Sequence, residues 1–451
     1  MTDVEGGPTT PFDFESATPT SVGAFPDAGP RVPSHARAQR SLTSSARAAL
    51  LAFWQANKRA ALVAALGTIG LRLITEWIGL VNQFGITFPH QVARHPSLLS
   101  QVWGHWDAGY YITIAQYGYA GRTIGHGQVP NEIAFAPLYP WGIRLVHGLT
   151  PLNYLASAEL LSALALFVAL VAVYRLVTLD GAGKGDGGVG SAGTTVILLL
   201  AFPTAFFLLA PYPESLTLAL VALSFLAARR GQWLLAGLLA AGVALTKYYM
   251  ALLIVALAVE LWQQRRTGVS LEGEPEPDPW SRDALRLGAA AVPTIAAMVA
   301  WIIYQKEHIG SGLAFLHVQS VFWHRHLAGP WTLFANTITE LRHWTFLDTP
   351  HGSVTILIDF VTVLLLAAVT VYVFLRVRPS YGVLLGLAWC VYTFETMLLS
   401  VTREVLVLFP LFLGLGLWAA GHPWRERVLL VLFIPCSYYL TQRFVTGAFA
   451  G

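Results

Sequence analysis

The chain has 451 residues, of which 55% are hydrophobic and only 12% are charged, and its formal net charge is +3. With a mean hydropathy of +0.57, it has too few charged side chains to cover the surface of a soluble domain of this size. Apolar runs of about 20 residues recur along it, which is the length that crosses the hydrocarbon of a bilayer. Because these runs are continuous instead of alternating, a transmembrane β-barrel is disfavoured, and we predict an all-α polytopic membrane protein.

The first 50 residues have a different composition from the rest. They are rich in Pro, Ser, Thr, Gly and Ala and contain little to bury, so residues 1–50 are predicted to be a disordered tail, and no cleavable signal peptide opens the chain. Arginines in this tail precede the first apolar run, which predicts a cytoplasmic N-terminus. Residues 51–451 are then one transmembrane domain.

Eleven spans are predicted, at residues 60–83, 156–178, 194–210, 213–229, 232–246, 248–263, 285–304, 354–376, 381–400, 405–420 and 427–445. Threaded from a cytoplasmic N-terminus, they leave 18 of the 28 Lys and Arg residues on the cytoplasmic side and nine outside, with one in the first span. This satisfies the positive-inside rule. Several of the middle spans are short, so tilted, paired or re-entrant helices are expected there.

Two long outer loops follow from this threading, at residues 84–155 and 305–353. Long loops without low complexity usually carry function, and both lie on one face. The first is expected to hold one or two amphipathic helices at the membrane interface, with apolar residues at helical spacing: Leu99, Val102, Trp106, Tyr110 and Ile114.

The stretch "HWDAGYYITIAQYGY", residues 105–119, carries the first candidate site. Its acid, Asp107, either caps a helix or pairs with a basic residue, or it accepts a proton as a general base. Burial among Trp106, Tyr110 and Tyr111 would raise the pKa of an aspartate above its ordinary value of about 3.9. His105 beside it makes only a weak metal pair with Asp107 and is interpreted as a substrate contact.

Three further polar residues are expected at the outer face. Glu214, in "FPTAFFLLAPYPESLTL", either caps a turn or forms a second polar wall of a cavity. Lys247, in "GVALTKYYM", either reaches out to lipid headgroups or binds a phosphate. Arg403, next to Glu404 in "LLSVTREVLVLFP", is either structural or a guanidinium fork for a phosphodiester or pyrophosphate.

The second outer loop contributes "FLHVQSVFWHRH", in which Gln319, His324 and Arg325 are the candidate contacts to sugar, phosphate or headgroup. Closed metal sites need three or four convergent ligands, and Cys390 and Cys436 both lie in apolar runs, so a metal site is disfavoured. Nucleotide-binding and hydrolase motifs are not evident in a fitting context. No cofactor is therefore predicted, and an activated substrate should arrive through the membrane; a nucleic-acid partner is not expected.

Several of these segments together resemble the PIG-V mannosyltransferase family. They are "HWDAGYYITIAQYGY", "FAPLYP", "FPTAFFLLAPYPESLTL", "GLLAAGVALTKYYM" and "REVLVLFPLF", in a likeness that runs from about residue 60 to the C-terminus. The resemblance implies a GT-C glycosyltransferase fold with many spans, here the about 11 transmembrane helices counted above, an acidic residue in the first outer loop and a polyprenyl-phosphate sugar donor. It implies that Asp107 is the base of an inverting transfer.

The resulting hypothesis is the transfer of a mannose or related hexose to a lipid-linked or surface glycan acceptor on the outer face of a membrane. The Arg-, Ala- and Gly-rich style of the chain and its short loops suggest a bacterial plasma membrane. The alternatives are a secondary transporter, which predicts inverted repeats and a polar site at mid-membrane, and a lipid-binding membrane protein without catalysis. The charges here gather at one face, and no such repeat is visible.

Overall fold

The computed structural model describes residues 34–85, 102–119, 129–181, 188–267, 280–343 and 353–451. It divides into two compact units, Met1–Ala56 and Asn57–Gly451. Helix α1 (Ser34–Gly85) begins in the first unit, and its residues from Asn57 onward belong to the second. Residues 1–33 of the predicted tail lie outside the described residues, and α1 covers the remainder of it.

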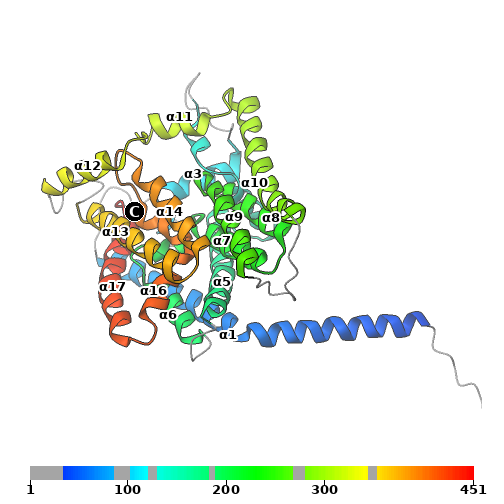
Figure 1. Cartoon of the computed structure of the whole chain (residues 1–451). Coiled ribbons are helices and arrows are strands. Elements are labelled where there is room, and N and C mark those ends of the chain that lie inside the picture. The colour runs from blue at the N-terminus through cyan, green and yellow to red at the C-terminus, as the bar shows by residue number, and fades with distance from the viewer. Residues whose placement is uncertain (1–33, 86–101, 120–128, 182–187, 268–279, 344–352) are drawn as a thin grey trace, which may run out of the picture. The chain divides into compact units, whose positions relative to one another are not determined.

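The second unit is built from helices, shown in chain order in Figure 1. After α1 they are α3 (Asp107–Tyr117), α4 (Leu138–Leu149), α5 (Tyr154–Asp180), α6 (Val189–Ala201), α7 (Glu214–Arg229), α8 (Trp233–Ala244), α9 (Leu253–Thr267), α10 (Trp280–Ile309), α11 (Ala314–Val321), α12 (Pro330–Arg342), α13 (Ser353–Arg376), α14 (Pro379–Thr393), α15 (Val401–Glu404), α16 (Phe409–Ala419) and α17 (Pro423–Val445). Short 3-10 turns join some of them: η1 (Asn131–Ala134), η2 (Ala205–Leu208), η3 (Tyr248–Leu252) and η4 (Val405–Val407). Among the described residues the one β-type contact is an isolated bridge between Leu327 and Glu395.

The helices confirm the all-α membrane class but not eleven full spans. Within the described residues, five helices are long and apolar enough to cross a membrane, at Asn57–Asn82, Tyr154–Asp180, Ser281–Ile309, Val354–Arg376 and Pro423–Val445. A sixth span is allowed by composition if Val401–Val407 and Phe409–Ala419 count as one broken helix, with a bend of 84° between them. The helices at Val189–Ala201 and Trp233–Ala244 are apolar but short. The prediction of eleven complete spans is therefore not supported.

The shortfall has a physical cause, because several predicted spans are interrupted at prolines. The predicted span 194–210 ends as a helix at Ala201, before Pro203, and continues as the separate turn η2. Helix α7 begins directly after Pro213, and α16 carries Pro410 in its first turn. Proline lacks the backbone N–H that a continuing helix needs, so each proline favours a helix start or break. Apolar composition alone does not reveal such breaks.

The core of this unit is formed around α5 and α7, which pack against each other. The two helices run parallel, because Asp180 at the end of α5 pairs with Arg229 at the end of α7, while Ser162 near the start of α5 donates a hydrogen bond to the carbonyl of Tyr212, just before α7. Helix α6 makes the return between them. The pair therefore has two distinct ends, and we refer to them as the Glu214 end and the Arg229 end.

The first predicted outer loop differs from the expected interfacial helix. Helix α3 begins only at Asp107, so Val102 and Trp106 lie outside it, and Leu99 is outside the described residues. Trp103 is fully buried and contacts the rings of Phe206 and Phe444. This segment is therefore packed into the core, and that packing fixes where α3 begins.

Candidate functional site

Asp107 occupies the first turn of α3, at a sharply bent backbone. Trp106, directly before it, has a φ of 57°, in the left-handed region that non-glycine residues seldom adopt. The amides of Ala108 and Gly109 donate to the carbonyls of His105 and Trp106 and close this turn. A carboxylate at a helix N-terminus is favoured by the helix dipole.

Arg403 reaches Asp107 from α15, a segment 296 residues further along the chain. Its Nη1 donates to Oδ2 of Asp107 at 2.8 Å. The arginine is held in place by its neighbour Thr402, whose backbone N–H and hydroxyl both donate to the buried carboxylate of Asp359 on α13. Because these hydrogen bonds hold α15 in place, they also fix the backbone position from which the Arg403 side chain extends to Asp107.

Glu214 and Lys247 complete the arrangement with Glu404. Nζ of Lys247 lies 2.8 Å from Oε2 of Glu404 and 3.3 Å from Oε1 of Glu214. Arg403 contacts the same two acids, with 3.6 Å from its Nε to Oε1 of Glu214 and 3.7 Å from its Nη2 to Oε1 of Glu404. We call these five residues, Asp107, Glu214, Lys247, Arg403 and Glu404, the charged cluster.

The charged cluster has one more carboxylate than cation, since three acids share one lysine and one arginine. Its acids differ in accessibility: the Asp107 side chain is 24% exposed, that of Glu404 12% and that of Glu214 1%. Oε2 of Glu214 is buried and has no hydrogen-bond partner within the described part of the chain. Asp107 is therefore the most accessible of the three acids, and the charged cluster carries excess negative charge.

Tyrosines surround the charged cluster. The hydroxyl of Tyr249 donates to Oε2 of Glu404 and lies 3.0 Å from that of Tyr392. The guanidinium of Arg403 lies over the ring of Tyr212, with 5.4 Å from Cζ to the ring centroid. Burial, with the nearby carboxylates of Glu214 and Asp107, raises the pKa of Tyr111 well above its ordinary value. Tyr111 therefore keeps its proton and can serve as a neutral hydrogen-bonding group.

Two aromatic residues beside Asp107, Tyr110 and Trp106, pack against different partners. Tyr110 stacks on Phe135, with ring centroids 4.8 Å apart, and Trp323 from the connection after α11 meets both rings. Trp106 instead contacts Phe449 edge-on at 5.5 Å. The sequence led us to expect Asp107 among apolar rings, but its closest partner is the guanidinium of Arg403.

His105 contacts a residue beside the charged cluster, Tyr212, through its backbone carbonyl. Its carbonyl accepts a hydrogen bond from the hydroxyl of Tyr212 at 2.9 Å, and its ring lies edge-on to Phe444. Burial lowers the pKa of the His105 imidazole below its ordinary value of 6.5. The neutral form of the ring is therefore favoured.

The second-loop residues do not join the charged cluster directly. Nε of Arg325 lies 3.1 Å from Oε2 of Glu395, and the Arg325 amide donates to the carbonyl of Gln319. His324 is exposed and has a φ of 54°. Within the described residues no group of three or more His, Cys, Asp and Glu side chains is arranged to hold a metal ion.

A second network of buried charges lies at the Arg229 end of α5 and α7, and the sequence did not lead us to it. Glu260, which is fully buried, accepts hydrogen bonds from Arg378 and from Ser380, and Arg229 pairs with Asp180 at 2.7 Å. The available signal was Glu260 itself, an acid within the apolar run predicted as span 248–263. Because its acids and arginines balance each other, this network is interpreted as a structural one.

Comparisons with known proteins give few matches. A scan against protein-family models and a search of curated proteins both find none. Among solved structures, the chain is similar to the Archaeoglobus fulgidus oligosaccharyltransferase in its complex with Zn and sulfate, at 13% identity and a TM-score of 0.40, and in its apo form, at 12% identity and a TM-score of 0.41. The first match covers 87% of this chain and 53% of that one, and the second covers 88% and 56%. The chain thus spans about half the length of these structures, and a likeness at this level carries no argument about activity.

Proposed function

We propose that the chain is a membrane glycosyltransferase of the GT-C type. It transfers a mannose or related hexose from a polyprenyl-phosphate donor to a lipid-linked or surface glycan acceptor, with inversion at the anomeric carbon. The observation that carries the proposal is the charged cluster, in which Asp107 from the predicted first outer loop pairs with Arg403, and Glu214 joins Arg403 to Lys247. The sequence segments that resemble the PIG-V family are the same segments that supply these residues.

In the proposed reaction, Asp107 accepts the proton of an acceptor hydroxyl. The hydroxyl oxygen forms a bond to the anomeric carbon while the bond from that carbon to the donor phosphate oxygen breaks, and polyprenyl phosphate leaves. The described structure gives Oδ1 of Asp107 no hydrogen-bond partner, whereas Oδ2 is taken by Arg403. Oδ1 is therefore open to an acceptor hydroxyl while Arg403 still holds Oδ2.

Because Arg403 is paired with Asp107, donor binding has to precede proton transfer in the proposed reaction. Both cations of the charged cluster are already engaged by carboxylates, so a donor phosphate has to displace one of them. Asp107 is the most exposed of the three acids and is the one most readily replaced. A phosphate that takes its place on the guanidinium both frees the carboxylate to act as a base and gains the counter-charge that the leaving group needs.

The test uses purified protein in proteoliposomes with polyprenyl-phosphate carrying radiolabelled mannose, and bacterial membrane extract as the pool of acceptors. The proposal predicts label transferred to an acceptor, with the anomeric configuration opposite to that of the donor. Label that stays on the donor with every acceptor pool contradicts the proposal. Unchanged donor accumulating inside the vesicles would instead support the transporter alternative.

A further inference from the structure

We infer that the segment from α11 to α12 is an interfacial membrane-binding element, whose exposed apolar side chains insert into the headgroup and acyl-chain boundary of the bilayer. The segment connects α10 to α13, and each of these holds a candidate span, at Ser281–Ile309 and Val354–Arg376. Both of its ends are therefore tied to places where the chain leaves the membrane. The inference does not depend on the proposed function.

Helix α12 has three distinct faces. One is buried, at Leu333 and Thr337, and α12 packs on α13. A second face is apolar and exposed, and Trp331, Ala335 and Ile338 follow one another on it at the i, i+4, i+7 spacing of a helical stripe.

The third face of α12 is polar and exposed. It carries Thr332, Asn336 and Thr339, again at the i, i+4, i+7 spacing. A helix that packs on the protein on one side and is divided into an apolar and a polar face on the other is the arrangement expected at a water–lipid boundary.

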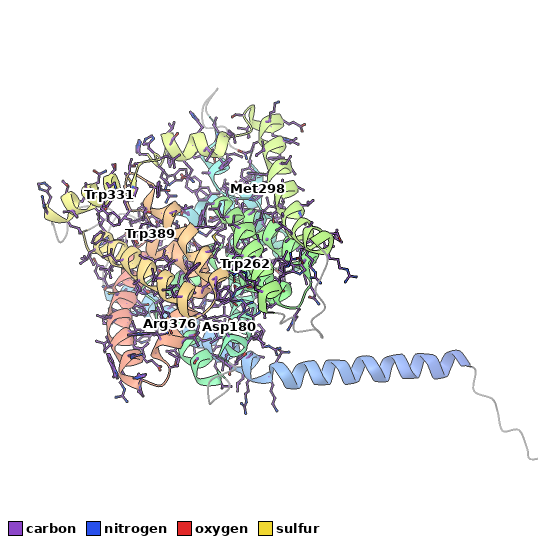
Figure 2. All side chains as sticks on the ribbon, viewed as in Figure 1. Asp180, Trp262, Met298, Trp331, Arg376 and Trp389 are labelled. Atoms are coloured by element: carbon purple, nitrogen blue, oxygen red, sulfur yellow. The ribbon has the colours of Figure 1, made fainter. Side chains whose placement is uncertain are left out.

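Several apolar side chains between α11 and α12 are so exposed that contact with water would be unfavourable for them. Leu327 is 93% exposed and Trp331 83% exposed, and Trp331 lies on α12 at the edge of the second unit in Figure 2. Leu313, Leu316 and Phe322 add exposed apolar area along α11 and its ends. Removal of apolar side chains from water is favourable, so this group of exposed apolar side chains favours an apolar environment.

The bilayer is the occupant that the neighbouring spans indicate. Exposed apolar side chains continue down α10 at Ile295, Val299 and Ile303 and down α13 at Val361 and Leu364. These belong to candidate membrane spans, and their exposed faces meet acyl chains. The apolar stripe of α12 therefore lies in the connection between two helices whose exposed apolar faces meet lipid, and tryptophan is enriched at the membrane interface.

The test is nitroxide accessibility in nanodiscs of phosphatidylcholine and phosphatidylglycerol. Single cysteines replace Trp331, Ile338, Thr332 or Thr339 in turn, in full-length protein whose Cys390 and Cys436 are changed to alanine. The two pairs are matched, because each polar position follows an apolar one directly and both pairs are one heptad apart. All four side chains are exposed, so the substitutions leave the packed face of α12 intact.

Accessibility to dissolved oxygen, relative to a water-soluble nickel chelate, should be several-fold higher at positions 331 and 338 than at positions 332 and 339. Equal access of the nickel chelate to all four positions would show an aqueous surface and overturn the inference. Shielding of positions 331 and 338 from both reagents would also overturn it, because the face would then be covered by protein.

Discussion

Replacement of Arg403 by glutamine tests the charged cluster through the stability of the fold. The substitution removes a cation that has contacts with Asp107, Glu214 and Glu404 at 2.8, 3.6 and 3.7 Å. Glu214 and Glu404 then have Lys247 as their one cation in the charged cluster, and Asp107 loses its ion-pair partner. Removing one partner of a buried ion pair typically destabilises a protein by about 3–5 kcal/mol, because the remaining charge is left uncompensated.

This loss can be converted to a melting temperature. With an unfolding entropy of about 2 cal/mol/K per residue over residues 57–451, a loss of about 3–5 kcal/mol corresponds to a fall in Tm of roughly 4–6 °C. The assay is thermal unfolding of detergent-purified protein, followed by intrinsic fluorescence. The matched control is Arg427→Gln, at an exposed arginine in the first turn or two of α17, for which a change within about 0.5 kcal/mol is expected.

The double variant Arg403→Gln with Asp107→Asn isolates the pair. Because the neutral asparagine side chain no longer adds to the uncompensated negative charge, the double variant should be less destabilised than the sum of the two single variants, by about 0.5–3 kcal/mol. If Arg403→Gln melts at the same temperature as Arg427→Gln, or if the two changes are simply additive, then Arg403 is not the centre of the charged cluster and the reasoning fails.

Three further outcomes follow from the structure. Glu260→Gln should lower the stability by about 3–5 kcal/mol, since it leaves Arg378 without its buried partner. Under the proposed function the folded variant should keep its KM for the donor; a raised KM would mean that the two networks are coupled. Burial lowers the pKa of His105, so the unfolded chain binds a proton more readily than the folded state does, and the stability should fall as the pH drops below about 6.5. The variant His105→Gln should therefore lose less Tm than the parent protein between about pH 7.5 and about pH 5.5. An equal loss in both proteins would contradict this. Asp359→Ala should lower the stability by about 1–3 kcal/mol, because the donors of Thr402 on α15 lose their acceptor. It should also reduce kcat about 10-fold to 100-fold, because Arg403 is then misplaced. A fall in Tm with an unchanged kcat would show that Asp359 does not position Arg403 for the reaction.

Part of the charged cluster could be predicted from the sequence. Asp107, Glu214, Lys247 and Arg403 each stand at the edge of an apolar run, and threading the runs through a membrane assigned all four to one face. The structure brings these four into contact. Their position at the edges of apolar runs was therefore the signal in the sequence, although the described residues do not form the eleven full spans used in the threading.

The pairing within the charged cluster could not be predicted in the same way. For Asp107 the sequence left open a pairing with a basic residue or a base among aromatic rings, and for Arg403 a structural role or a phosphate contact. In the structure the cations pair with the acids, and the partner of Asp107 is Arg403. Which side chains meet depends on how α3, α7 and α15 pack and on where η3 and η4 interrupt the helices, and a hydropathy window contains neither. The role of Glu404, which contacts both cations, also depends on this packing.

The most direct test of the central claim is the turnover of Asp107→Asn with polyprenyl-phosphate mannose, measured together with donor binding. Asparagine keeps the shape of the side chain but cannot accept the proton, so donor binding should persist while kcat falls by about 10²- to 10⁴-fold. A folded Asp107→Asn protein that binds the donor and turns over at the rate of the parent protein would contradict the assignment of Asp107 as the base.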